Sequence, residues 1–597
     1  MSNELKERGQ MDEKYLWHLQ DIYASSEAFE ADLESCRALL DAMAAWKGRV
    51  KEDPMAAVRA YFDGMKRFTR LYSYAFMKQD EDGGNAEAQA RSSRTMSLIV
   101  QAQSATAYLE PELLEMDADA LKALIDDPAN SDYSVYLSEI LRRKPHTLSA
   151  AEEQLLSSAG EVLSAPGDIF SMFDDVDAPF PEVTREDGES MVLSHAGYGV
   201  LIRSKDERVR REAYEAMMGT FAKFASTVTA MYAGHVKADM FTMRARKYPT
   251  CREMALDNNQ IPVAVYDSLV EAVHKALPSL EKALQVRKAR LGLQTMHMWD
   301  LYAPIMDDFD LDMDYETAYQ TVITALAPLG KDYTDLLQKA HDEGWIDVYP
   351  NKNKRSGAYS SSCYGVHPYV LLNQTDDLES CSTIAHEMGH ALHTWHSEHA
   401  QPYPKADYSL FVAEVASTTN EVLLMRYLMK QYQGNRKATA FLCNQLIEAF
   451  RTTVFRQTLF AEFELRAHTL AEQGQALTKE SLCAIHRELN ETYYGSVCEM
   501  DDLIGNEWMR IPHFYSSYYV YVYATGYCAA VAIADRILSE GEEAVKGYKR
   551  FLSAGCSVPP IEALKYAGVD MNDPRTVERA LKVFDETVDM LREALED

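Results

Sequence analysis

The chain has 597 residues, 47% of them apolar and 25% charged, and a formal net charge of −32 at pH 7. This length exceeds what one hydrophobic core supports, so two or more lobes are expected. The acidic balance would repel phosphate backbones and anionic lipid, which argues against nucleic acid or a membrane surface as a partner.

The N-terminal segment and the cysteines predict a cytoplasmic protein. The sequence begins MSNELKERGQMDEKYLWHLQ, which is charged and lacks the apolar core of a secretory signal. No stretch approaches the ~20 apolar residues that a membrane-spanning helix needs. The nine cysteines are scattered and form no CxxC motif. We therefore expect reduced thiols rather than disulfides or a cysteine-ligated zinc.

Most of the chain has apolar residues at the three- and four-residue spacing of helices. Residues 27–46 are one example. Residues 204–241 are another, and this segment begins with Ser204 and Glu207 at the spacing of a capping box. The sequence therefore predicts a mainly α-helical fold.

Two segments interrupt the helical pattern. Residues 179–202 carry prolines, a polar turn and a β-prone run, which predicts a hairpin or a junction between lobes. Residues 350–374, PNKNKRSGAYSSSCYGVHPYVLLNQ, predict two short strands around GVHP. We place a boundary near residue 200, with an N-terminal helical lobe over residues 1–200 and a larger lobe that holds the chemistry over residues 201–597.

A histidine-rich segment, CSTIAHEMGHALHTWHSEHA, follows the predicted strands. It contains an HExxH motif made by His386, Glu387 and His390. On a helix, residues four apart lie about 40° apart around the axis and about 6 Å apart along it, so two imidazoles can converge on one ion. Glu387 sits beside the first ligand and can act as general base on a water held by the metal.

The segment is predicted to be helical, with a small β-sheet beside it. Asp376 and Glu379 have capping-box spacing at its start, and no proline follows before Pro402. Gly389 costs roughly 1 kcal/mol of helix propensity relative to alanine. That cost is explained if another part of the chain packs against the backbone there. A glycine that is merely tolerated is the alternative.

Two further histidines offer competing ligand sets. His393 lies about 10 Å further along the helix axis than His386, so one ion cannot contact both. His396 is ten residues after His386, which matches the metzincin spacing HExxHxxGxxH. That motif needs glycine where this chain has His393, because the chain must turn out of the helix there. We therefore favour a third ligand from another segment.

Residues 408–432 predict an apolar helix with a polar stripe of Glu414, Ser417 and Glu421. A carboxylate on such a helix is costly to bury unless it is paired or binds a metal. Glu414 is 28 residues after His386, which leaves room for one turn and an antiparallel return. We expect Glu414 to be the third ligand and Glu421 to accept the other N–H of a ligand histidine.

The segments HEMGHALH, FVAEVASTTNE and RIPHFYSSYYVYVYATGY resemble the thimet oligopeptidase and oligoendopeptidase F family of zinc peptidases. The resemblance implies a two-lobed helical ellipsoid with a deep central channel, and cytoplasmic cleavage of short peptides. It also implies one zinc ion per chain, held by His386, His390 and Glu414, with Glu387 as base. Manganese or cobalt could occupy the same ligands.

The family also places a histidine and tyrosines opposite the zinc, where they stabilise the tetrahedral intermediate. This implies that His513 contacts substrate and that Tyr521 donates to the oxyanion, with Tyr515 as the next choice. The register of the tyrosine run is ambiguous. The alternatives are Tyr518, Tyr519 and Tyr523.

These features predict a zinc endopeptidase that acts on short peptides. The strand around residues 357–363 could pair its edge with an extended peptide, or could be an ordinary hairpin that covers the metal helix. Two rival functions stay open. A zinc carboxypeptidase with the same HExxH would release single C-terminal residues, whereas a non-catalytic helical protein would bind peptides without cutting them.

Overall fold

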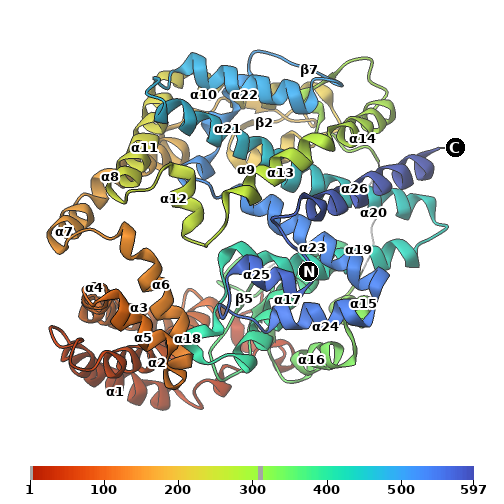
Figure 1. The fold of residues 1–597 in the computed structure, drawn as a ribbon. Helices are drawn as coiled ribbons and strands as arrows, with labels where there is room; N and C mark the ends of the chain where they lie inside the picture. The colour runs from red at the N-terminus through yellow and green to blue at the C-terminus, as the bar shows by residue number, and fades with distance from the viewer. Residues whose placement is uncertain (1–4, 307–312, 597) are drawn as a thin grey trace. The chain divides into compact units, whose positions relative to one another are not determined.

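The computed structural model describes residues 5–306 and 313–596, which form a mainly α-helical fold with three small sheets (Figure 1). The expected fold class is therefore confirmed. Among these residues, no helix combines the length and the apolar character needed to cross a bilayer. Contacts divide the chain into two compact units, and each unit is assembled from three separate stretches of sequence.

The units do not coincide with the lobes expected from the sequence. Unit 1 comprises residues 1–147, 310–427 and 533–570, and unit 2 comprises residues 148–309, 428–532 and 571–597. The expected boundary near residue 200 falls inside the first stretch of unit 2, residues 148–309. The division into lobes at residues 1–200 and 201–597 stays a prediction.

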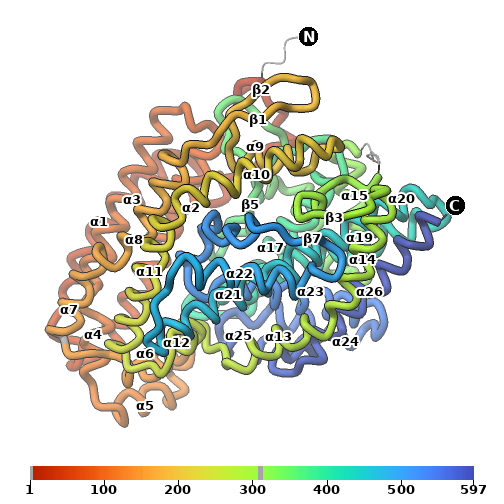
Figure 2. The backbone as a smooth tube through the Cα atoms, turned by 90° about the horizontal axis from the view of Figure 1, so that it is seen from above, coloured from red at the N-terminus to blue at the C-terminus, as the bar shows by residue number. Residues whose placement is uncertain are grey.

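Unit 1 is built on three long helices near the N-terminus. The helices of unit 1 are α1 Ser26–Ala44, α2 Pro54–Glu81, α3 Ala86–Thr106, α4 Leu109–Leu114, α5 Ala118–Asp126, α6 Ser134–Arg143, α15 Tyr315–Ala325, α16 Lys331–Asp342, α17 Leu378–Ala400, α18 Tyr403–Ala406, α24 Glu542–Leu552 and α25 Pro560–Tyr566. α1, α2 and α3 lie side by side (Figures 1 and 2) and bury Phe29, Phe68 and Leu98 in one core.

Unit 2 is also helical, and its last helix closes one side of its core. The helices of unit 2 are α7 Ala150–Ser158, α8 Gly160–Met172, α9 His195–Leu201, α10 Glu207–Lys223, α11 Ala225–Ala245, α12 Cys251–Asp257, α13 Val263–Lys275, α14 Leu277–Arg290, α20 Arg436–Phe450, α21 Arg456–Glu472, α22 Lys479–Tyr494 and α26 Pro574–Leu595. α26 packs against α13, α14 and α20 (Figure 2). Two further helices, α19 Leu410–Gln431 and α23 Tyr521–Glu540, contain boundaries between the units.

The predicted helix over residues 204–241 is two helices, α10 and α11, with a break at Phe224. The cap of α10 is Asp206, whose side chain accepts from the N–H of Arg208, and not Ser204 as the spacing suggested. Asp206 is an equally good cap chemically, so the sequence could not decide between the two.

The two segments that interrupt the helical pattern form strands as predicted, and three further short strands lie elsewhere among the described residues. The strands are β1 Glu182–Thr184, β2 Ser190–Val192, β3 Met296–His297, β4 Ile346–Asp347, β5 Tyr359–Ser361, β6 Tyr369–Leu371 and β7 Cys498–Glu499. β1 and β2 form the predicted hairpin, and β5 and β6 are the two predicted strands around GVHP. β4 pairs in parallel with β6, which gives a sheet of order β4-β6-β5.

This three-stranded sheet supports α17, the helix that carries HExxH. α17 packs against both β5 and β6. On the other side, Tyr369 and Leu371 of β6 belong to the same core as α1–α3. The position of α17 therefore depends on the sheet and on the N-terminal helices beneath it.

A buried ion cluster fixes the N-terminal segment to this sheet. Asp347 at the end of β4 accepts from the guanidinium of Arg8 at 2.9 Å and lies 2.7 Å from Nζ of Lys354. The side chains of Asp347 and Lys354 are each 1% exposed. Removing one partner of such a cluster leaves an uncompensated buried charge.

We expect Asp347→Ala to lower the free energy of unfolding by about 3–5 kcal/mol, because Lys354 stays buried without its carboxylate. Urea denaturation followed by circular dichroism measures the change. Asp335→Ala is the control, since it removes the exposed pair between Lys331 and Asp335 and should cost less than about 1 kcal/mol. Equal effects of the two variants would contradict the role given to Asp347.

Candidate active site

α17 places the HExxH motif on one continuous helix. The carboxylate of Asp377 caps its first turn by accepting from the N–H of Ser380 at 2.7 Å. The cap is therefore Asp377, and not Asp376 as its spacing from Glu379 suggested. The helix runs without interruption to Ala400, so no turn carries the chain out of it after the motif.

Gly389 allows α17 and α19 to approach each other closely. A β-carbon at this position would lie 2.5 Å from the Cα of Ser417 and 2.8 Å from the carbonyl oxygen of Ala416. Such distances leave no room for a side chain. Of the two explanations of Gly389 offered by the sequence, close packing against its backbone is therefore the correct one. The approach brings Glu414, one turn before Ser417, to the two histidines of the motif.

His386, His390 and Glu414 converge on one point. The Nε2 atoms of the histidines are 3.2 Å apart, and Oε2 of Glu414 lies 3.4 Å from the first and 3.3 Å from the second. Two donors bound to one tetrahedral zinc ion at about 2.0–2.1 Å lie about 3.3–3.4 Å apart. The three atoms therefore fit one face of a zinc tetrahedron. Among the described residues, this is the one group of three such side chains close enough to share an ion.

Neighbouring side chains orient two of the three candidate ligands, His386 and Glu414. Oε2 of Glu421 lies 3.3 Å from Nδ1 of His386, so it can accept the N–H of this ring and leave Nε2 for a metal. The hydroxyl of Ser417 donates to Oε2 of Glu414 at 2.9 Å. The amide of Asn420 donates to the carbonyl of Ala385 at 3.1 Å, which ties α19 to α17.

The electrostatics of this group favour a cation. Burial raises the pKa of Glu414, but the hydrogen bond to His390 and the charges of both histidines outweigh it and lower the pKa to about 2. Burial lowers the pKa of His386, but the hydrogen bond and charge of Glu421 raise it to about 9. The carboxylates therefore favour positive charge at this point, which a divalent ion would supply.

Glu387 lies next to the candidate ligands and is only 7% exposed. Burial raises the pKa of its carboxyl above the ordinary value, and the neighbouring histidines oppose that shift. A carboxylate with a raised pKa is a stronger base and is better matched to taking a proton from water near neutral pH.

The two competing histidines, His393 and His396, pack against aromatic side chains. His393 is 1% exposed and stacks on Tyr408, with ring centroids 3.8 Å apart. His396 packs on Tyr333 at 6.3 Å. Burial lowers the pKa of His393 to about 3 and that of His396 to about 4, so both are neutral. The metzincin ligand set is not formed, because α17 continues through these positions.

His513 lies in unit 2, on the short 3-10 helix η11 Pro512–Tyr515, and is grouped with two tyrosines. Its Nε2 is 3.3 Å from the hydroxyl of Tyr523. The ring of Tyr519 is parallel to the His513 ring at 6.4 Å and lies 5.3 Å from the Tyr523 ring. We call these three residues the His513 cluster. Both tyrosines were alternatives in the sequence analysis, and neither was the first choice.

The two preferred tyrosines are packed inside unit 2. The ring of Tyr515 stacks on Phe170 at 4.4 Å, and its buried hydroxyl has no hydrogen-bond partner among the described residues. Tyr521 is 3% exposed and packs on Tyr266 at 5.2 Å. The roles of Tyr515 and Tyr521 toward substrate stay predictions.

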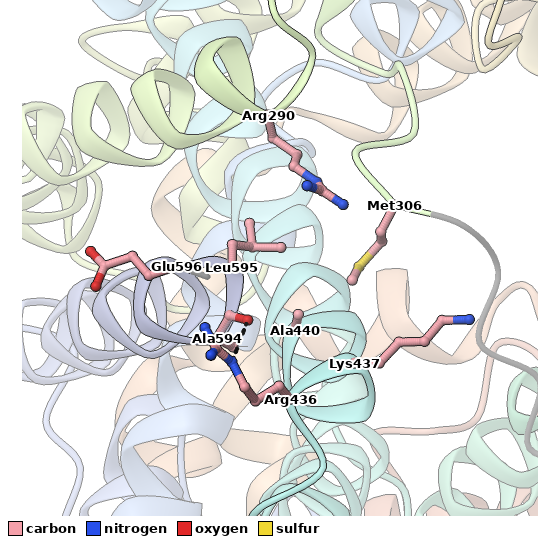
Figure 3. Close-up of a pocket in the computed structure, with 8 residues that line it drawn as sticks. All are labelled: Arg290, Met306, Arg436, Lys437, Ala440, Ala594, Leu595 and Glu596. Atoms are coloured by element: carbon pink, nitrogen blue, oxygen red, sulfur yellow. Dashed lines mark hydrogen bonds between the residues drawn. The ribbon is translucent and has the colours of Figure 1, made fainter.

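One surface pocket of about 660 Å³ lies elsewhere in unit 2. Figure 3 shows it between α14, α20 and α26, with the basic side chains of Arg290, Arg436 and Lys437 around it. Arg436 donates to the main-chain carbonyl of Glu593 at 3.2 Å. Its role is therefore to hold the end of α26, and none of the predicted site residues lines this pocket.

Comparison with known proteins identifies related chains over the full length. Residues 200–583 match the profile described as Peptidase family M3, and residues 112–180 match the one described as Oligopeptidase F. Oligopeptidase PepF of Bacillus subtilis is 42% identical over 598 aligned residues, covering 100% of this chain and 89% of that protein.

Two crystal structures have the same fold. One, described as a peptidase from Chlamydophila abortus, has a TM-score of 0.94 at 32% identity and covers 99% of this chain and 100% of that chain. The other is oligoendopeptidase-F from Enterococcus faecium, with a TM-score of 0.73 at 33% identity, covering 95% of this chain and 99% of that chain.

We expect Gly389→Ala to weaken metal binding at least about tenfold, because the added methyl pushes α19 and Glu414 away from the histidines. Titration of the metal-depleted protein with zinc against a competing chelator measures the affinity. Gly219→Ala on α10 is the control, since a β-carbon there meets nothing within 4 Å. Unchanged zinc affinity in Gly389→Ala would show that the helix spacing does not set the ligand geometry.

The ligand set itself is tested by Glu414→Ala and His396→Ala. We expect Glu414→Ala to lose stoichiometric metal and His396→Ala to keep it, because Glu414 completes the group of donors and His396 packs on Tyr333. Elemental analysis of the purified variants gives the metal content. Metal loss confined to His396→Ala would favour the metzincin ligand set.

Proposed function

This chain belongs to peptidase family M3, and on that basis we propose that it is a zinc-dependent endopeptidase that hydrolyses internal bonds of short oligopeptides in the cytoplasm. Membership makes it a metallo-oligopeptidase with peptide substrates. Zinc as the ion, internal cleavage by this chain and the cytoplasmic setting are the proposed parts. The spacing of His386, His390 and Glu414 carries the proposal, because it suits one divalent ion.

We assign the metal to His386, His390 and Glu414, one ion per chain. When bound, zinc polarises the scissile carbonyl and makes a water molecule more acidic. Zinc is the usual ion for two imidazoles and a carboxylate, although manganese or cobalt can use the same donors. Glu421 holds the ring of His386 in the orientation that binding requires.

Glu387 is the proposed general base. It takes a proton from the attacking water and then gives that proton to the leaving nitrogen. Its burial supports this assignment, since a carboxyl with a raised pKa can both accept and release a proton near neutral pH.

We propose that the edge of β5 holds the peptide in an extended conformation. β5 has β6 on one side and no other strand partner among the described residues, and it packs beside α17. Main-chain hydrogen bonds to such an edge bind peptides with little dependence on sequence. This arrangement suits an enzyme that acts on many short peptides.

His513 is the proposed contact to substrate, with Tyr523 as the donor to the developing oxyanion in preference to Tyr521 and Tyr515. Tyr523 is hydrogen-bonded to His513, whereas the other two are packed in the core. Burial lowers the pKa of His513, so it is a neutral hydrogen-bonding partner at pH 7. One such donor contributes about 3–4 kcal/mol to transition-state stabilisation in comparable sites.

We expect Glu387→Gln to keep its zinc and to lose about 10²–10⁴-fold in kcat. The substrate is a peptide blocked at both ends, and mass spectrometry of the products shows where it is cut. Glu398→Gln is the matched control, because Glu398 is a half-buried glutamate on the same helix outside the ligand group. Full activity of Glu387→Gln would reject its role as base.

The same assay on the unaltered protein separates the rival functions. Cleavage of the blocked peptide at internal bonds supports the endopeptidase, provided that a chelator abolishes this cleavage and added zinc restores it. No cleavage of the blocked peptide, with single residues released from the free C-terminus of an unblocked one, would indicate a carboxypeptidase. Binding without cleavage would indicate a peptide-binding protein.

A further inference from the structure

A partly buried polar network holds the loop next to the His513 cluster and has no part in the function proposed above. It joins two helices of unit 2, α11 and α21, to the loop at residues 516–520. This loop connects His513 to Tyr523, so its conformation decides how far apart these two side chains are. The network consists of His235 and Asp239 on α11, Glu464 and His468 on α21, and Ser517 and Tyr518 in the loop.

The loop has a backbone conformation that needs external support. Tyr518 has a φ of 57°, in the left-handed region that bulky residues rarely adopt. Its N–H donates to Oε1 of Glu464 at 2.6 Å. Its ring packs on His468 at 5.0 Å and on Tyr266 at 6.0 Å. Side chains of α21 therefore contact both the backbone and the ring of Tyr518.

The preceding residue is held by α11. The hydroxyl of Ser517 donates to Oδ2 of Asp239, and Nε2 of His235 lies 2.9 Å from the same hydroxyl oxygen. Because the Ser517 proton is used by the carboxylate, His235 must donate from Nε2 to this oxygen. The ring of His235 also packs on Tyr515, in the same short helix as His513, at 5.3 Å.

Asp239 is fixed in turn by a buried histidine. Nε2 of His468 lies 3.1 Å from Oδ2 of Asp239, and its Nδ1 lies 2.9 Å from the carbonyl oxygen of Glu464. Both ring nitrogens face acceptors, so both carry protons and His468 is a cation. Burial lowers the pKa of His468, but the hydrogen bond to Asp239 raises it above the ordinary value. The pair is an ion pair in which the histidine is fully buried.

We propose that Asp239 and His468, acting through Ser517 and Tyr518, are positioning residues that hold His513, Tyr519 and Tyr523 in place for peptide hydrolysis. The inference rests on the proposed function, which gives the His513 cluster a role in catalysis. A buried ion pair is costly unless its geometry is good and its remaining hydrogen bonds are satisfied. The hydrogen bonds of the pair to Ser517 and to the carbonyl of Glu464 lead to the loop and to the helix that supports it.

Ser517→Ala is the most direct test, because it removes the link between the loop and Asp239 at almost constant volume. We expect kcat to fall between about tenfold and 100-fold, with KM and zinc content little changed. Hydrogen exchange at residues 511–523 should become faster. Ser517→Thr keeps the hydroxyl and should restore most of the activity. Asp239→Asn, which keeps the size of the side chain but not its charge, should reproduce the loss.

A double variant separates positioning from general destabilisation. If Ser517 acts through the His513 cluster, adding Ser517→Ala to His513→Ala should lower kcat by less than the same change in the unaltered protein. Asp300→Asn is the structural control. Asp300 is fully buried and pairs with Arg210 at 2.6 Å in the same unit. This control should lower the melting temperature and leave both kcat and the exchange of residues 511–523 unchanged.

Three results would overturn the proposal. These are unchanged kcat and exchange in Ser517→Ala, full additivity with His513→Ala, and an unchanged kcat in His513→Ala alone. None of these results bears on the proposed metal ligands or on the proposed role of Glu387 as general base. If the chain does not hydrolyse peptides, the proposed function fails instead, and the exchange measurement still tests whether the network holds the loop.

Discussion

The approach of α17 to α19 at Gly389 is the contact on which the site depends. A metal ion needs its donor atoms placed within a few tenths of an ångström, and two helices carrying ordinary side chains at their contact would be too far apart. Gly389 brings the backbone of Ser417 against α17, and Glu414 then reaches the histidines. The loss of helix propensity at glycine is small beside the free energy available from metal binding.

A similar arrangement occurs in each unit: a side chain proposed to bind metal or substrate is held in place by neighbouring polar groups. Glu421 and Ser417 hold the candidate ligands in unit 1. Asp239 and His468 lie beneath the loop of the His513 cluster in unit 2. In each case a charged or hydrogen-bonding side chain is fixed from behind, which lowers the reorganisation needed during reaction.

Local patterns in the sequence predicted the metal group and the helices that carry it, because HExxH and the polar stripe of residues 408–432 are periodic on single helices. The role of Gly389 could only be posed as a question, since its answer depends on a helix 28 residues away. The sequence could not show which tyrosines lie beside His513, because this depends on the positive φ of Tyr518. Nothing local in a tyrosine run signals that conformation. Each compact unit is assembled from three separate stretches of the chain, an arrangement that no local pattern in the sequence signals.

Anomalous diffraction from crystals of the zinc-loaded protein, recorded on both sides of the zinc absorption edge, tests the central claim most directly. The account predicts one strong peak per chain, in contact with Nε2 of His386, Nε2 of His390 and a carboxylate oxygen of Glu414. A peak at other side chains, or none at full zinc loading, would contradict it.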